Sequence, residues 1–194
     1  MIKKILFTIL VVFFVASQAF AFNPLVVCSG SAAVAGGSEE IGYTTAGTED
    51  PVDFVSGNIR CSAIDAPSGN GTITSISMYS SCASELADLK VGIYQDDTGA
   101  PTTRIGTEAT FTDEPSWALG WKSFTVSFPV SSGVSYWICV ESVYEEGAHV
   151  YLYYDVGAAG SRHYDANDFS AWPATFTSDS NSTALYSFKA TVEF

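Results

Sequence analysis

From residue 39 onward the chain is a succession of short segments in which apolar and polar residues alternate, interrupted at intervals by Gly, Pro, Asn or Asp. Strand side chains point alternately to the two faces of a sheet, so this pattern predicts antiparallel strands. The predicted strands are Ile41–Thr45, Asn58–Asp65, Thr72–Ser80, Leu89–Gln95, Arg104–Phe111, Trp121–Pro129, Val134–Val143, His149–Asp155 and Ala184–Phe194. Only residues 83–88 and 165–171 could hold a short helix. The predicted fold class is all-β: an antiparallel β-sandwich, interpreted as a jelly roll with an N-terminal extension.

The phase of the alternation predicts which side chains form the core. One face of each of three strands is continuously apolar: Leu89, Val91 and Ile93; Phe124, Val126 and Phe128; and Val134, Tyr136, Ile138 and Val140. The opposite faces should then meet solvent. They carry instead an unusual number of aromatic rings and one cysteine: Tyr94, Trp121, Trp137, Cys139, Tyr151 and Tyr153.

Three interpretations of this aromatic outer face stay open. Loops or the N-terminal segment could fold over it as a second small core, because aromatic rings contribute much buried apolar area. The rings could instead form a platform on which the C–H faces of sugars stack, with nearby carboxylates and amides binding hydroxyl groups. They could also form an interface between subunits.

The first 21 residues have the form of a bacterial-type export signal. Lys3 and Lys4 are followed by an apolar run over 5–16 and by Ala19-Phe20-Ala21, a small-x-small cleavage site. The run is shorter than the roughly 20 residues of a membrane span, so we expect cleavage rather than anchoring. The sequence thus predicts a signal peptide over 1–21, a flexible or draped segment over 22–38 and one β-sandwich domain over 39–194, secreted or at the cell surface.

Charge narrows the class of partner. The chain carries a net charge of −13, and loss of Lys3 and Lys4 leaves six basic against 21 acidic residues, or −15. Such a field repels phosphate backbones and anionic lipid, so nucleic acid and membrane insertion after cleavage are not expected. The partners that this charge still allows are a glycan, a metal ion or another surface protein. The acidity could also serve only to keep a secreted protein soluble.

Four cysteines follow the cleavage site: Cys28, Cys61, Cys82 and Cys139. In an exported chain they predict two disulfides, with three alternative connectivities. Because Cys139 lies on the aromatic face, one hypothesis pairs it with Cys28 and leaves Cys61 to Cys82. The cysteines are too far apart in the sequence for the close pairs of a zinc site.

One loop combines polar and aromatic residues in the way that recognition loops do. The candidate ligand-binding residues are Tyr164, Asp165 and Trp172 here, with Trp121 and Trp137 on the aromatic face. The alternative is an irregular lid whose rings pack on the sheet edge. Asp165 and Asn167 place oxygen ligands at alternating positions, which suggests calcium as the one cofactor to consider, although the Gly and distal Glu of an EF-hand loop are absent.

No catalytic motif is visible. The chain has two histidines, His149 and His163, and no G-x-S-x-G elbow, phosphate loop or HExxH helix. A pair of carboxylates for glycoside hydrolysis is harder to exclude among 21 acids. We therefore expect a protein that is not an enzyme, with glycoside hydrolysis kept as the enzymatic alternative.

Several segments, made of predicted strands with their aromatic residues and of turns, resemble those of a known family. They are Ala66-Pro67, Gly71–Tyr79, Leu89–Asp97, Gly99–Pro101, Gly120-Trp121, Ser135–Ile138 and Tyr186–Thr191. In their order the chain resembles a secreted β-sandwich module of bacterial and archaeal surface proteins, often a jelly roll and sometimes named as choice-of-anchor, which is similar to carbohydrate-binding modules. The resemblance implies architecture, surface location and glycan binding or adhesion, and it supplies no catalytic residue. The chain departs from the module in its four cysteines.

These observations predict a non-catalytic extracellular binding module, with a carbohydrate or another surface component as partner. The alternative of a different class is a structural subunit of an extracellular filament or surface layer. Such a subunit would self-assemble through its N-terminal segment, with Cys28, and through exposed β edges.

Overall fold

The computed structural model describes residues 36–54, 57–83, 86–144, 149–166 and 172–194. Across these ranges the chain forms strands and connecting loops and no helix. Residues 83 and 86–88, within a range considered for a short helix, are not helical, because Leu86 already begins a strand. The proposed signal peptide and residues 22–35 lie outside the described ranges.

Two six-stranded sheets contain most of the strands, and every pairing within them is antiparallel. Sheet A comprises β1 (Ser38–Gly42), β2 (Val52–Phe54), β4 (Gly71–Cys82), β7 (Trp117–Val130), β9 (Val150–Leu152) and β14 (Phe188–Glu193). Sheet B comprises β3 (Asn58–Ile64), β5 (Leu86–Asp97), β6 (Ala100–Glu114), β8 (Tyr136–Tyr144), β11 (Arg162–Ala166) and β12 (Ser180–Ser182). A separate ribbon pairs β10 (Tyr154–Val156) with β13 (Ala184–Tyr186).

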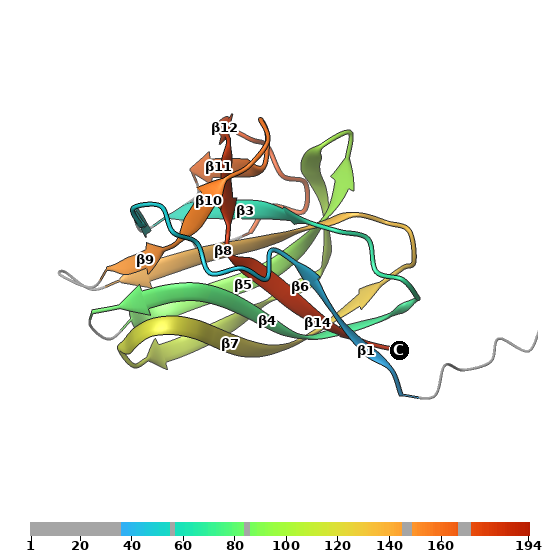
Figure 1. The fold of residues 1–194 in the computed structure, drawn as a ribbon, viewed down its shortest axis with the longest axis horizontal. Helices are drawn as coiled ribbons and strands as arrows, with labels where there is room; N and C mark the ends of the chain where they lie inside the picture. The colour runs from blue at the N-terminus through green and yellow to red at the C-terminus, as the bar shows by residue number, and fades with distance from the viewer. Residues whose placement is uncertain (1–35, 55–56, 84–85, 145–148, 167–171) are drawn as a thin grey trace, which may run out of the picture. The chain divides into compact units, whose positions relative to one another are not determined.

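The strand order follows from pairings that are distant in the sequence. Sheet A runs β1-β14-β4-β9-β2, and β7 also pairs with β4. Sheet B runs β12-β11-β3-β8-β5-β6. In Figure 1, β10, β11 and β12 group at the top of the view, away from β7 near the bottom.

The main core lies between the inner faces of the two sheets. Its buried side chains include Ile73, Ile76, Met78, Leu89, Val91, Ile93, Phe124, Val126, Phe128, Tyr136, Ile138 and Val140. The predicted core faces are therefore confirmed, and Val134 packs half-buried against the same cluster. Full burial of one large apolar side chain contributes about 1.5–3 kcal/mol, so this cluster supplies the main driving force for folding.

A β-bulge explains an irregularity in the core pattern of β4. Ile73 and Ile76 both point inward although they are three residues apart. Against β14, Ile73 pairs with Val192 and Ser75 with the adjacent Thr191, so β4 carries one extra residue at this point, which restores the inward phase. A strict period of two would have turned Ile76 outward.

Two predicted strands are each divided in the structure. Residues 149–155 form β9 and β10, separated at Tyr153, and residues 184–194 form β13 and β14, separated at Ser187. At Tyr153 the chain passes from sheet A to the small ribbon, and at Ser187 it passes from the ribbon back to sheet A. The sequence also did not reveal β2, β11 and β12, which are three to five residues long.

Candidate functional site

Three aromatic rings cross the outer face of sheet A in one row. Trp121 on β7 lies directly opposite Tyr79 on β4, with ring centroids 5.5 Å apart. The Tyr79 ring meets that of Tyr153 at 5.7 Å, edge to face. All three residues are half-buried. This row of Trp121, Tyr79 and Tyr153 is called the aromatic row below.

The backbone beneath the aromatic row is fixed by a closed set of three hydrogen bonds. The amide of Tyr79 donates to the carbonyl of Ser187 (2.9 Å), that of Ser187 to Tyr153 (3.1 Å), and that of Tyr153 to Tyr79 (3.2 Å). This junction lies where β9 gives way to β10 and β13 to β14. Three segments far apart in the sequence are thereby tied at one point, which holds two of the three rings in place.

A polar row runs beside the aromatic row. Lys189 on β14, Ser77 on β4 and Ser123 on β7 occupy one register line across sheet A. The hydroxyl oxygens of Ser77 and Ser123 are 2.7 Å apart. The ammonium of Lys189 donates to Glu40 at 2.7 Å and stands 4.9 Å from the centre of the Trp121 ring. Hydroxyl, ammonium and carboxylate groups therefore border the rings.

Further apolar groups extend the aromatic surface at both ends. On β9, Tyr151 is half-buried and stacks on the ring of His149, with centroids 6.1 Å apart. On β7, Leu119 is two residues before Trp121 and is 50% exposed. A row of this kind on an open sheet face can contact a flat ligand with apolar C–H surfaces and hydroxyl edges.

The outer face of sheet B is covered by a segment that the structure describes. Tyr94, Trp137, Trp172 and Phe176 form a second buried cluster there, with Ile59 and both bonded cysteines. The segment over 172–176 reaches this face by pairing with β6: the amide of Arg104 donates to Ala174 O (3.0 Å), and that of Phe176 to Thr102 O (2.7 Å). The interpretation of a loop forming a second small core is confirmed for sheet B.

The sequence analysis placed all the outward aromatic residues on one outer face, and this was wrong. Tyr94, Trp137 and Cys139 belong to sheet B, whereas Trp121 and Tyr151 belong to sheet A. Strand phase predicts inward or outward but not the sheet to which a strand belongs. Trp137 and Trp172 are 1% and 4% exposed, so neither offers a ring face to an external ligand.

Buried polar contacts fix the second cluster. Trp172 Nε1 donates to the carboxylate of Glu141, which is fully buried. Tyr94 donates its hydroxyl to Pro173 O at 2.7 Å, and burial raises the pKa of this phenol well above its usual range. Trp137 Nε1 donates to Asp96 Oδ1 at 2.7 Å. These bonds satisfy the polar ends of rings that are otherwise enclosed in apolar surroundings.

The disulfide joins Cys61 and Cys139, directly opposite each other on β3 and β8, with Cα atoms 4.1 Å apart. Pairing of Cys139 with Cys28, and of Cys61 with Cys82, is therefore wrong. Neighbouring positions of an antiparallel pair bring two Cβ atoms within bonding reach, whatever their sequence separation. Cys82 is buried in the main core, and Cys28 lies outside the described residues, so a second disulfide stays a prediction.

His163 on β11 connects this covered face to the β5–β6 turn. It is 5% exposed, and its ring meets that of Trp137 edge to face at 4.9 Å. Nε2 lies 3.2 Å from Gly99 O, which can only accept, so Nε2 is the donor; Nδ1 lies 2.8 Å from Ser178 Oγ. Burial lowers the pKa of His163, against the opposing effects of the Gly99 carbonyl and Asp96.

The loop residues predicted to bind a ligand do not share one open surface. Tyr164 and Asp165 are consecutive on β11 and point to opposite faces. The hydroxyl of Tyr164 donates to Asn58 Oδ1 at 2.7 Å. Desolvation, followed by repulsion from Asp179, raises the pKa of Asp165.

For calcium, Asn167 lies outside the described residues. Within the described ranges, no group of three or more His, Cys, Asp or Glu side chains could hold a metal ion. The proposed Asp165–Asn167 site therefore stays a prediction.

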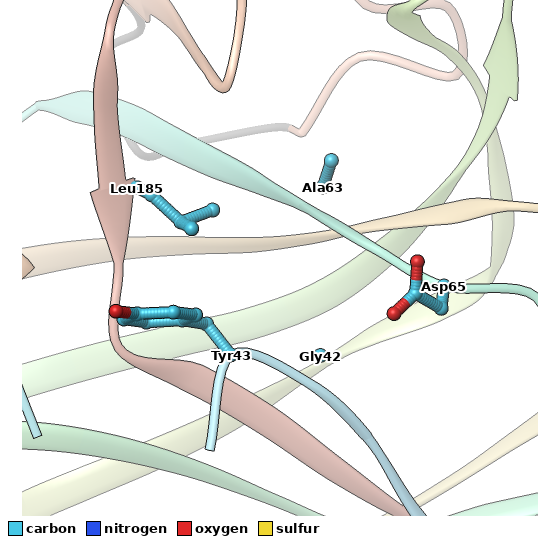
Figure 2. A pocket seen from close by; sticks show the side chains of 5 residues that line it. All are labelled: Gly42, Tyr43, Ala63, Asp65 and Leu185. Carbon is cyan, nitrogen blue, oxygen red and sulfur yellow. The ribbon is translucent and has the colours of Figure 1, made fainter. Parts of the chain in front are cut away.

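A pocket of about 220 Å³ opens beside the end of β3. Its lining residues are Gly42, Tyr43, Ala63, Asp65 and Leu185. Figure 2 shows the Tyr43 ring and the Asp65 carboxylate on opposite sides of Gly42, with Leu185 and Ala63 above them. A second pocket of about 300 Å³ shares Ala63 and Asp65 with it and continues to Asp96 and Trp137. These features are called the Asp65 pocket and the adjoining pocket.

No protein-family model matches the chain, and no curated protein sequence matches it. No helix of the described part of the chain has the length and apolar character needed to cross a bilayer.

Sequence reasoning did not select Tyr79, Lys189, Tyr43 or Asp65 as site residues. For Tyr79 a signal existed, because it alternates with the buried Met78 and must point outward. Lys189 reaches the polar row, and Tyr43 and Asp65 reach the pocket, only through pairings distant in the sequence, which no local pattern encodes.

Proposed function

We propose that the protein is a secreted, non-catalytic binding module that recognises a carbohydrate through the aromatic row on sheet A. The observation that carries this proposal is the juxtaposition of two rows on one sheet face. The rings of Trp121, Tyr79 and Tyr153 supply apolar surface. The bordering Ser123 and Lys189 supply hydrogen-bonding groups, and the buried Ser77 bonds to the Ser123 hydroxyl.

The chemistry of a sugar suits such a surface. A pyranose has apolar C–H faces, which can lie on an aromatic ring, and an equatorial rim of hydroxyls that both donate and accept hydrogen bonds. Among the bordering groups, the ammonium of Lys189 can donate, the carboxylate of Glu40 can accept, and the hydroxyl of Ser123 can do either. The net charge of −13 favours a neutral or cationic glycan over an anionic one.

The covered disulfide supports an exported protein. Cys61 and Cys139 are bonded, and disulfides persist in oxidising compartments. This agrees with the export signal predicted over residues 1–21, whose cleavage can be measured directly by mass spectrometry of the expressed protein.

The test is a titration of neutral polysaccharides into the purified protein, followed by the same titration on variants. Trp121→Ala should weaken binding about tenfold, since loss of an aromatic contact commonly costs about 1.4 kcal/mol or more. Tyr79→Ala should act in the same direction. Tyr164→Ala, which changes a tyrosine away from the row, is the matched control and should leave the affinity unchanged.

Two outcomes would contradict the proposal. If Trp121→Ala converts an oligomer seen by light scattering into a monomer, and no glycan binds either form, the aromatic row is a subunit interface. If incubation with a bound polysaccharide releases new reducing ends, the protein is a glycoside-active enzyme rather than a non-catalytic module.

A further inference from the structure

We infer that the Asp65 pocket binds a primary ammonium group carried on an apolar carbon body. The pocket is separate from the aromatic row, so this inference does not rest on the proposed function. It follows from the balance of hydrogen-bond donors and acceptors in the lining and from the positions of the neighbouring basic residues.

The side chains lining the Asp65 pocket present acceptors and no available donor. Asp65 is exposed, its carboxylate is acceptor-only when ionised, and no described residue donates a hydrogen bond to it. The one side-chain donor in the lining is the hydroxyl of Tyr43, and it already donates to Asp155 Oδ2 at 2.6 Å. A ligand group that only donates, such as an ammonium, fits this inventory better than a hydroxyl, which must also find a donor.

The Tyr43 ring is held firmly in the lining. Asp155, which accepts from the Tyr43 hydroxyl, also accepts from the amide and the hydroxyl of Thr48 at 2.9 and 2.8 Å. The hydrogen bond from Tyr43 and those from Thr48 lower the pKa of Asp155, so this anchor stays ionised at neutral pH. Tyr43 therefore gives the pocket a fixed aromatic wall, and aromatic rings attract cations through their negative faces.

The basic side chains near the pocket, Lys189 and Arg162, bind other residues and do not neutralise Asp65. Among the residues that the structure describes, no lysine or arginine lines the Asp65 pocket or the adjoining one. Lys189 is the register partner of Gly42, yet its ammonium pairs with Glu40. Arg162 donates to the hydroxyl of Tyr186, which follows Leu185 in β13 and so points to the other side of that strand.

Apolar groups complete the pocket. Leu185 lies near the Tyr43 ring and Ala63 lies above Gly42, so the carbons that carry the ammonium would contact apolar surface while the charge reaches Asp65 (Figure 2). The adjoining pocket adds the carboxylate of Asp96, although this group already accepts from Trp137 Nε1. The acidic field of the whole chain attracts cations to both.

The test is an NMR titration of the isotope-labelled protein with n-butylammonium chloride, and with n-butanol as the neutral control of the same shape. The expected result is a saturable shift of the amide signals of Gly42, Ala63, Asp65 and Leu185 with the ammonium and a much weaker one with the alcohol. Asp65→Asn should weaken the ammonium about two- to fivefold, the effect of an ion pair at an exposed carboxylate. Asp97→Asn, an exposed aspartate outside both linings, should not.

Two further probes identify the source of the ammonium. Binding of Nα-acetyl-lysine amide more tightly than glucosamine points to a lysine side chain of a protein, and the reverse order points to an amino sugar. The inference is overturned if n-butanol shifts the pocket signals as strongly as n-butylammonium. It is also overturned if the shifts map elsewhere, or if Asp65→Asn and Asp97→Asn weaken binding equally.

Discussion

The indole ring of Trp172 lies against the backbone of Gly92. Any larger residue at position 92 would collide with the indole and displace it. A Cβ atom at Gly92 would lie 2.5 Å from Cζ3 of Trp172. Gly92 is the register partner of Cys139, so the indole lies over the strand beside the disulfide. Glycine is usually unfavourable in the middle of a strand. Here it is required because the indole of Trp172 occupies the space that a side chain at position 92 would need.

Replacing Gly92 by Ala should therefore destabilise the protein, because the rigid indole must move off the sheet. The expected loss in the free energy of unfolding is about 1–3 kcal/mol, the range for overpacking a buried site. Urea denaturation followed by fluorescence measures it. Gly120→Ala is the matched control, since its Cβ would meet nothing closer than Ala118 O at 4.0 Å, and it should change stability by less than about 0.5 kcal/mol.

Removing the disulfide should cost more than removing any single half-buried contact. It closes a long loop, with the two cysteines 78 residues apart in the sequence. The Cys61→Ala, Cys139→Ala double variant should lose about 2–5 kcal/mol of unfolding free energy. Denaturation of the double variant and of the parent, without reductant, gives the difference. Equal midpoints in the two proteins would mean that the bond adds no stability.

Trp172 should also protect the disulfide from reduction. Thiol–disulfide exchange requires direct attack on a sulfur atom, and Cys61 and Cys139 are both fully buried beneath the cover. Trp172→Leu should raise the rate of reduction by dithiothreitol in the native state, measured by alkylation and mass spectrometry. Phe124→Leu is the control, because it weakens the main core and leaves the cover in place. The same acceleration in both variants would attribute reduction to global unfolding.

Stability should fall as the pH drops below the ordinary pKa of histidine, about 6.5, and His163 should account for part of the slope. Burial lowers the pKa of His163 in the folded protein, so the unfolded chain takes up a proton first as the pH falls. The contribution of this group is complete above pH 6.5 and is lost as the pH falls through the window between the unfolded and folded pKa values.

The measurement is the free energy of unfolding between pH 8 and pH 5, for the parent protein and for His163→Gln. The variant should show a shallower dependence over this window. A parent and a variant with parallel curves would show that His163 does not titrate differently in the folded and unfolded states.

Several features of the fold and the candidate site were predictable from the sequence because they depend on neighbouring residues. The alternation that places Phe124 and Phe128 in the core also turns Trp121 outward, and the structure has all three as predicted. The antiparallel sandwich follows from many such segments separated by turn residues. The division of one predicted strand at Tyr153 was not predictable, because its apolar pattern continues through the break.

The sequence by itself determined the class of the fold and the inward or outward phase of most strands, since that phase is a local property of an extended backbone. Only the tertiary structure decided which strands share a sheet. It set Cys61 opposite Cys139, covered Trp137 with Trp172, and left Trp121 open beside Tyr79. The physical reason is that strand pairing is non-local: a backbone edge can pair with many others, and the packing of the whole chain selects among them.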